Sequence, residues 1–274
     1  MKSLNILDLF SGIGGMSLGF EAANYDDFDF NELPKDQKSK SDNFFKTIAF
    51  CEIDKNCHKV LNTHFKGVPI FDDVTKLKAS DLKDSVDIIT GGFPCQDLSF
   101  ANAKRKGFDG ARSSLFEHIL RIANETQAKY ILFENSDRLI YNREFFEIFT
   151  KRIKSYGFKY EAFIFQASDF GYPHQRRRLY IIAYTDKIRS IQTNPFFDKL
   201  AIKKPTNRTR RELGGLCSRI SDLQKQGYKH ARDCRDIRKD NGISERLVKL
   251  GMFGNSLIPA IPYAFAKVIK EIEK

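Results

Sequence analysis

The chain has 274 residues, of which 41% are hydrophobic, and it carries a formal net charge of +11 with an isoelectric point near 9.3. This length suits one large domain, or one domain and a small lobe, with enough apolar side chains for a real core. The positive charge indicates a polyanionic partner, most often nucleic acid, although a merely basic surface gives the same total.

The cysteines form no CxxC pair, and their number is odd: Cys51, Cys57, Cys95, Cys217 and Cys234. Such a set argues against a disulfide framework or a zinc cluster, so we expect no metal site and a reducing cytoplasmic environment. The N-terminal MKSLNILDLF becomes polar too early for a signal peptide, and no apolar run reaches membrane-spanning length. A soluble intracellular protein without a membrane partner is expected.

Short β-rich runs alternate with helical patterns along the first two thirds of the chain. This alternation predicts the α/β class with a doubly wound, mostly parallel sheet, in which ligands bind beyond the carboxyl ends of the strands. The expected strands are Leu4–Leu9, Thr47–Glu52, Val86–Thr90, Tyr130–Glu134, Phe158–Gln166 and Leu179–Tyr184, and the expected helices lie near 14–23, 54–65, 113–127 and 143–156.

Two segments interrupt the alternation. Residues 24–46 are polar and without periodicity, which indicates an inserted surface loop. Residues 187–247 also lose the pattern, and their part 203–240 holds 12 Lys/Arg against 5 Asp/Glu, or +7 of the chain's +11. The pattern returns in Phe253–Lys270 with a C-terminal helix. The predicted organisation is one domain of residues 1–186 and 248–274 and a small basic lobe of residues 187–247.

A glycine-rich loop, Phe10-Ser11-Gly12-Ile13-Gly14-Gly15, joins the first strand to a helix. Glycines let the backbone approach a ligand closely, although Ser17 replaces the third glycine of the dinucleotide fingerprint and a plain tight turn remains an alternative. Glu52 ends the second strand, where an acid typically binds ribose hydroxyls. Asp73, after the run Val68–Phe71, is placed to reach a base. Loop and acids together favour a nucleoside-containing cofactor, while helix capping and turn formation remain alternatives for the two acids.

A single thiol, Cys95, follows Pro94 in the turn GGFPCQ after the fourth strand. A lone cysteine is most often a small buried hydrophobe. Here the position at a strand's carboxyl end and a following helix start favour a thiolate, which is a strong nucleophile near neutral pH. Basic side chains that follow would stabilise that thiolate: Lys104, Arg105, Lys106 and Arg112.

An acid and a run of arginines follow the next two strands. Glu134 ends the fifth strand, beside Cys95 if the fourth and fifth strands are neighbours, and a partly buried carboxyl there can stay protonated and donate a proton. A helix-capping acid is the alternative. The run Arg176–Arg178 enters the strand Leu179–Tyr184, so at least one arginine should point into the domain toward an anionic or carbonyl partner.

The ordered motifs FSGIGG, GGFPCQ, FENS, PHQRRR and GNSLIP resemble the DNA cytosine-C5 methyltransferase family of prokaryotic or phage type. The resemblance covers nearly the whole chain outside residues 24–46 and the basic lobe. It implies a Rossmann-like, S-adenosylmethionine-dependent domain with a small target-recognition lobe. It further implies base flipping and methylation of cytosine in double-stranded DNA, with S-adenosylhomocysteine as product. A monomer that serves restriction–modification beside a cognate endonuclease is expected.

The resemblance also implies roles for individual residues. Cys95 would attack cytosine C6, Glu134 would act at N3, and Arg178, supported by Arg176, would bind O2. Charge that the attack leaves on the ring needs such an acid and such a cation. Residues Asp97–Ser113 are similar to the family's mobile loop. The implied cofactor contacts are Phe10, Ser11, Gly12, Ile13, Gly14, Gly15, Glu52, Ile53, Asp73, Val74, Gly92, Pro94, Leu115, Asn255 and Ser256.

Departures from the family's pattern and competing functions bear on this hypothesis. Ser136 stands where the family usually has Val, and His174, before Gln175, stands where it usually has Gln. A tRNA-methylating branch shares every motif but usually carries a Cys-Phe-Thr tripeptide, which this chain lacks. Non-catalytic DNA-binding relatives tend to lose the thiol or the acid, and both are kept here. Base-specific contacts are expected from arginines of the lobe, such as Arg208, Arg210, Arg211 and Arg219.

Overall fold

The computed structural model describes residues 3–25, 28, 30, 43–94, 115–170, 176–188, 195–196, 199–200 and 257–274. The chain divides into two compact units. The first comprises Met1–Phe165, Arg177–Ala201 and Ser256–Lys274, and the second comprises Gln166–Arg176 and Ile202–Asn255. Because most of residues 187–247 lie outside the described part, the basic lobe predicted there stays a prediction.

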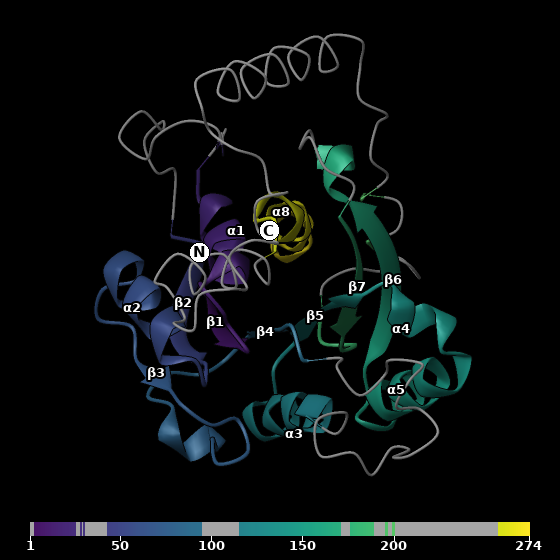
Figure 1. The fold of residues 1–274 in the computed structure, drawn as a ribbon, viewed down its shortest axis with the longest axis horizontal. Coiled ribbons are helices and arrows are strands. Elements are labelled where there is room, and N and C mark those ends of the chain that lie inside the picture. Colours follow the sequence, from purple (N-terminus) through teal and green to yellow (C-terminus); the bar gives the residue numbers. More distant parts are fainter. Residues whose placement is uncertain are drawn as a thin grey trace, which may run out of the picture. The chain divides into compact units, whose positions relative to one another are not determined.

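A seven-stranded sheet in the order β3-β2-β1-β4-β5-β7-β6 forms the frame of the described residues (Figure 1). Neighbouring strands pair in parallel from β3 to β5, whereas β5 and β7 are antiparallel. The predicted mostly parallel α/β sheet is therefore confirmed, and the carboxyl ends of five strands meet at one edge. The strands are β1 (Leu4–Leu9), β2 (Phe45–Cys51), β3 (Ile70–Phe71), β4 (Ile88–Gly91), β5 (Tyr130–Ser136), β6 (Lys159–Gln166) and β7 (Arg177–Tyr184).

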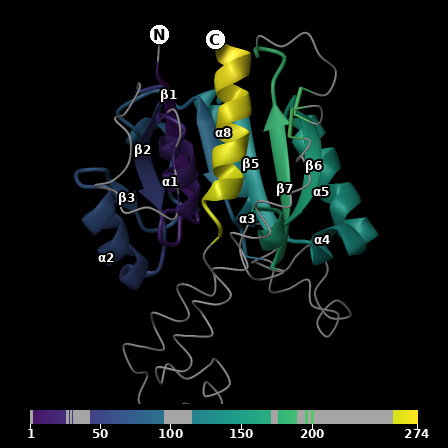
Figure 2. The same ribbon diagram turned by 90° about the horizontal axis from the view of Figure 1, so that it is seen from above.

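Helices cover both faces of this sheet, with α1 and α8 side by side on one face and α3 on the other (Figure 2). This arrangement explains the near-continuous apolar sequence of the central strands, whose two faces are both kept from water. No helix among the described residues is long and apolar enough to cross a bilayer. The helices are α1 (Gly15–Ala22), α2 (Lys55–His64), α3 (Leu115–Thr126), α4 (Arg138–Tyr141), α5 (Arg143–Ser155) and α8 (Ala260–Glu273), with 3₁₀ turns η2 (Ala79–Asp81) and η4 (Ala167–Phe170).

Aromatic side chains fill the two layers between the helices and the sheet. On the α3 and α5 side, the ring of Phe149 lies 4.9 Å from that of Phe116 and 5.2 Å from that of Phe133. On the opposite side, Phe265 of α8 packs against Tyr180 of β7 at 5.9 Å. Edge-to-face and tilted ring pairs of this kind add to the stabilisation from apolar burial. The site residues at the strand ends thus stand on a rigid support.

The boundaries of several elements differ from those predicted. β2 begins at Phe45 rather than Thr47, because Phe44 and Phe45 are buried and the Asn24 side chain hydrogen-bonds both the N–H and the C=O of Phe45. The polar insert is thus narrower than 24–46 at both ends. β5 continues to Ser136, since its last residues pair with the start of β7. Glu134 therefore lies inside a strand and not after it.

Candidate functional site

The glycine-rich loop after β1 has an unusual backbone. Phe10, Gly12 and Gly14 have φ values of 53°, 54° and 85°, in the left-handed region that favours glycine. A Cβ at Gly14 would lie 2.7 Å from the Phe65 ring, so packing as well as φ demands glycine there. A Cβ at Gly12 would meet nothing within 4 Å. The loop is therefore closed against α2 at Gly14 and open to an incoming ligand at Gly12.

Glu52 follows β2 and holds this loop. Its carboxylate accepts hydrogen bonds from the Gly12 N–H at 2.7 Å and the Asp54 N–H at 2.9 Å. Its own N–H donates to the Phe71 carbonyl at 2.9 Å, which ties the ends of β2 and β3 together. The neighbouring Ile53 is 77% exposed, an unusual state for a large apolar side chain. Glu52 and Ile53 thus form a polar and apolar pair beside the open part of the loop.

Asp73 lies after β3 in a tight turn. The Thr75 hydroxyl and amide donate to its carboxylate at 2.7 and 2.9 Å, and these bonds hold the pKa of Asp73 below its usual value. Val74, the next residue, is buried. Leu115, at the start of α3, packs against the same apolar core as Val74. Asp73 thus provides an ionised acceptor after β3, and Val74 and Leu115 both contribute to the same apolar core.

A buried carboxyl beneath the loop escaped the sequence-based prediction. Asp8 of β1 is fully buried and accepts hydrogen bonds from the Ser17 amide and hydroxyl, at 3.3 and 2.8 Å, and from the Thr90 hydroxyl at 2.7 Å. It therefore joins β1, α1 and β4 below the loop. Burial raises the pKa of Asp8 to about 7, although the hydroxyl donors oppose the shift. Ser17, which replaces the third glycine of the dinucleotide fingerprint, donates two hydrogen bonds to the Asp8 carboxyl group.

The raised pKa of Asp8 predicts that the contribution of this residue to stability falls with rising pH. The folded protein keeps a proton on Asp8 between about pH 4 and 7 while the unfolded chain has lost it, so the contribution of Asp8 is fully present below pH 4 and is lost as the pH rises toward and through 7. A shift of this size corresponds to about 4 kcal/mol, an order-of-magnitude value. Asp8→Asn does not titrate, and its amide oxygen can still accept from Ser17 while its amide nitrogen donates to the Thr90 hydroxyl oxygen. Denaturant unfolding at pH 5 and pH 8 should show Asp8→Asn gaining on the wild type at pH 8, and parallel pH profiles would contradict the prediction.

Glu134 of β5 and Arg178 of β7 form an ion pair across the two antiparallel strands. The Arg178 Nε lies 3.0 Å from a Glu134 carboxylate oxygen, with side-chain exposures of 27% and 15%. Because Ser136 pairs with Arg178 and Glu134 with Tyr180, the two charged residues are diagonal neighbours on one face. The other Glu134 oxygen would be 3.0 Å from a Cβ at Gly92. The acid thus sits over the backbone that leads from β4 toward Cys95.

Asn135 fixes this same turn and was not singled out in the sequence. It is buried, and its amide nitrogen donates to the Phe93 carbonyl at 3.0 Å. Pro94 is the last residue described before Cys95. The buried asparagine in FENS therefore joins the two motifs GGFPCQ and FENS directly.

The three arginines entering β7 have different surroundings. Arg178 pairs with Glu134, while Arg177 lies 3.4 Å from Asp137. The carbonyl of Arg176 accepts from the Ala167 amide at 3.0 Å within the second unit. The structure therefore brings Arg178 of this run to Glu134.

Several residues named from the sequence lie outside the described part. These are Cys95, the loop Asp97–Ser113, His174, Gln175, the lobe arginines Arg208, Arg210, Arg211 and Arg219, and the C-terminal pair Asn255 and Ser256. Their roles stay predictions.

The sheet order and the residues at its carboxyl edge define a Rossmann-like α/β fold of the S-adenosylmethionine-dependent methyltransferase class. The family model for C-5 cytosine-specific DNA methylases matches residues 4–240. The chain belongs to this family.

Named relatives agree with this assignment. The chain is 32% identical over 181 residues to the Type II methyltransferase M.CviJI of Paramecium bursaria Chlorella virus IL3A, covering 66% of the chain and 43% of the relative. It is 33% identical over 220 residues to the Type II methyltransferase M.NgoBI of Neisseria gonorrhoeae, covering 80% of the chain and 59% of the relative. The chain thus spans about half the length of these curated relatives.

Solved structures share the fold. A DNA modification methyltransferase encoded within an E. coli prophage superposes with a TM-score of 0.53 at 26% identity, over 71% of this chain and 50% of that one. The S. pombe Dnmt2 methyltransferase gives a TM-score of 0.54 at 21% identity, over 75% of this chain and 58% of that one. The second likeness supports the fold alone.

Proposed function

We propose that the chain is a DNA cytosine-C5 methyltransferase that flips a cytosine out of double-stranded DNA. Bound S-adenosylmethionine supplies an electrophilic methyl group. The observation that carries the proposal is the Glu134–Arg178 ion pair over Gly92, at the end of the strand that leads to Cys95. An acid and a cation side by side match the two polar groups, N3 and O2, on one edge of a cytosine ring.

The described residues at the loop fit an adenosyl cofactor. The open space above Gly12 lets a ligand approach the backbone. The Glu52 carboxylate can accept hydrogen bonds from hydroxyl groups, and the exposed Ile53 offers an apolar surface. We assign the ribose hydroxyls to Glu52 and the adenine to Ile53, Asp73, Val74 and Leu115. The remaining proposed contacts are Phe10, Ser11, Ile13, Gly14, Gly15, Gly92 and Pro94, with Asn255 and Ser256 from outside the described residues.

The chemistry needs a nucleophile because the cytosine ring is a poor carbon nucleophile by itself. In the proposed mechanism the Cys95 thiolate forms a bond to C6, and the displaced electron pair makes C5 nucleophilic. Glu134 holds a proton at N3, and Arg178, with Arg176 in support, binds O2, so the charge that develops on the ring is stabilised. After C5 has been methylated, a base removes the C5 proton and the returning electrons break the C6–sulfur bond.

Replacing the proposed acid should slow the reaction without removing the cofactor. Glu134→Gln keeps the side chain's shape but can neither donate a proton to N3 nor pair with Arg178, so we expect kcat to fall by about 10²–10³-fold. Binding of S-adenosylhomocysteine, measured by calorimetry, should stay within about twofold. Asp137→Asn, which weakens the adjacent ion pair with Arg177, is the matched control and should keep its kcat. An unchanged kcat in Glu134→Gln would exclude the assigned role.

The substrate class is tested with the wild-type chain. Tritiated methyl groups from S-adenosylmethionine should pass to duplex DNA and not to tRNA. Bisulfite sequencing of DNA from cells that express the protein should show methylated cytosines in one short sequence. Label in tRNA alone would support the tRNA-methylating branch, and no label in either, with cofactor still bound, would support a non-catalytic DNA-binding protein.

The biological setting belongs to the same proposal. The two curated relatives above are named Type II methyltransferases, which supports a role in restriction–modification beside a cognate endonuclease. We place such an activity in the cytoplasm and assign it to a monomer, with target recognition in the basic segment 187–247.

A further inference from the structure

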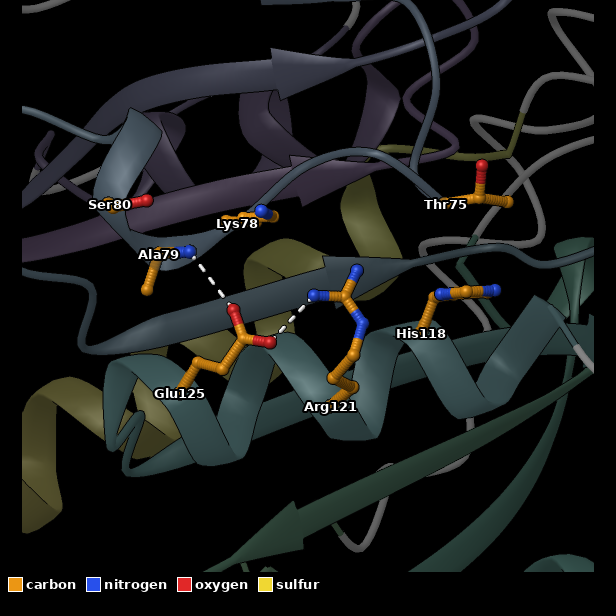
Figure 3. Close-up of a pocket in the computed structure, with 7 residues that line it drawn as sticks. All are labelled: Thr75, Lys78, Ala79, Ser80, His118, Arg121 and Glu125. Atoms are coloured by element: carbon orange, nitrogen blue, oxygen red, sulfur yellow. Dashed lines mark hydrogen bonds and ion pairs between the residues drawn. The ribbon is translucent and has the colours of Figure 1, made fainter.

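Arg121 of α3 reaches out of its helix to the turn that carries Asp73 and Val74. Its guanidinium donates to the Val74 carbonyl at 3.1 Å and to the Leu77 carbonyl at 2.8 Å. One helical turn later, Glu125 accepts from Arg121 at 2.7 Å with one oxygen and from the Ala79 amide at 3.0 Å with the other. Figure 3 shows Glu125 between the Ala79 amide and the Arg121 guanidinium. Arg121, Glu125 and Ala79 also line an open cavity of about 570 Å³. Two side chains of α3 thus hold the segment 74–79 at three backbone positions.

The turn has few other attachments to its surroundings among the described residues. Its internal bonds run from the Lys76 and Leu77 amides to the Asp73 carbonyl and from Thr75 to the Asp73 carboxylate. These bonds shape the turn but do not fix it to the sheet or to a helix. The Val74 and Leu77 side chains are buried, but apolar contacts do not fix the orientation of the turn relative to α3. The planar Arg121 guanidinium fixes this orientation, because its hydrogen bonds to the two carbonyls are directional.

The same helix begins with Leu115, which is assigned to the adenine together with Asp73 and Val74. We propose that Arg121 is a positioning residue that sets the distance and orientation between Asp73–Val74 and Leu115, and so determines how tightly the adenine of the cofactor is held. The inference rests on the proposed function, since it needs an adenosyl cofactor at this edge of the sheet. Arg121 itself, directed at protein carbonyls and Glu125, makes no contact with the cofactor in this account.

Arg121→Met tests the inference, since methionine keeps much of the apolar stem and removes both carbonyl bonds. We expect the Kd for S-adenosylhomocysteine, measured by calorimetry, to rise about tenfold, the usual scale for loss of charge-assisted hydrogen bonds. Arg121→Lys should resemble Arg121→Met, because one ammonium group cannot reproduce the fork that bridges two carbonyls and Glu125. A lysine variant that binds like the wild type would show that charge alone matters and would overturn the inference.

Arg152→Met is the matched control. Arg152 makes a two-pronged ion pair with Glu117, also on α3, at 2.7 and 2.8 Å, but it touches no part of the 73–79 turn. The Arg152→Met variant should lower the melting temperature at least as much as Arg121→Met does. The Kd for S-adenosylhomocysteine should be unchanged in Arg152→Met. Equal increases of Kd in both variants would mean a general loss of stability and would overturn the inference.

A second ligand separates positioning from simple destabilisation. S-inosylhomocysteine carries oxygen in place of the adenine amino group, so it lacks the exocyclic N–H donor that the Asp73 carboxylate would accept from. The wild type should prefer the adenosyl compound, and Arg121→Met should lose about tenfold of that preference, because Asp73 is no longer held in place. An unchanged preference overturns the inference while leaving the proposed function intact. If the wild type binds neither compound, both the inference and the proposed function fail.

Discussion

Cys95→Ser should abolish methyl transfer to DNA while the variant still binds S-adenosylhomocysteine. The serine hydroxyl is similar in size but ionises far less readily than a thiol, so the addition to cytosine C6 loses its nucleophile. We expect a decrease in kcat of about 10³-fold or more, equivalent to about 4 kcal/mol in the activation barrier. Transfer of tritiated methyl groups to duplex DNA measures the loss, and calorimetry with S-adenosylhomocysteine measures the retained binding. Methyl transfer at a rate near that of the wild type would refute covalent catalysis by Cys95.

A buried thiol provides the control for this substitution. Burial raises the pKa of the Cys57 thiol to about 12, so it stays protonated near neutral pH and offers no nucleophile. Cys57→Ala should therefore keep kcat, apart from a modest loss of stability. Duplex DNA containing 5-fluorocytosine adds a direct test, because fluorine cannot leave C5 as a proton does. With S-adenosylmethionine present, the wild type should form a complex that survives denaturation, and Cys95→Ser should not.

Chain order and residue type were sufficient to predict most of the sheet. Apolar runs of strand length, alternating with helical patterns, located β1, β4, β5 and β7 within a few residues, and the order of the motifs indicated the family. The sequence also placed Glu134 at the end of one strand and Arg178 at the start of another. It did not indicate that they meet at 3.0 Å, because that depends on the antiparallel register of β5 and β7. Register between strands that are about 40 residues apart in the chain carries no local signal.

Long-range contacts explain what the sequence could not indicate. Asp8, Ser17 and Thr90 form one buried network, yet each residue taken alone resembles an ordinary polar residue beside a strand or in a helix. Arg121 resembles a solvated helix residue until its two carbonyl partners are known. Thr90 lies 82 residues from Asp8, and the carbonyl partners of Arg121 lie 47 and 44 residues from it, so the information is in the packing of the sheet and its helices. The loop at Gly12 and the acid at Glu52 could be predicted from the sequence, because each follows a strand whose end is marked by the apolar pattern. The structure joins them by a hydrogen bond.

Gly19→Ala should destabilise the protein although it improves helix propensity. Gly19 lies inside α1, where alanine is favoured by about 1 kcal/mol on propensity alone. An added Cβ, however, would lie 2.4 Å from the Pro259 carbonyl oxygen, 2.5 Å from Pro262 Cγ and 2.9 Å from the Tyr263 amide of α8. Two of these three atoms are backbone, so no side-chain rotation relieves the contact and α8 must move away. We expect a net loss of about 2 kcal/mol or more, and a melting temperature lower by about 5 °C or more.

Gly15→Ala on the same helix tests whether backbone contact is the cause. Its added Cβ would come within 3.2 Å of the flexible Leu257 side chain and within 3.4 Å of the Leu257 carbonyl oxygen, so the neighbour can shift and the melting temperature should fall less than in Gly19→Ala. Because α8 follows directly after the segment of Asn255 and Ser256, displacement of the helix in Gly19→Ala should also raise the Kd for S-adenosylhomocysteine. A melting temperature that rises in Gly19→Ala would mean that helix propensity outweighs the contact, and that α1 and α8 are not held as closely as their backbones indicate.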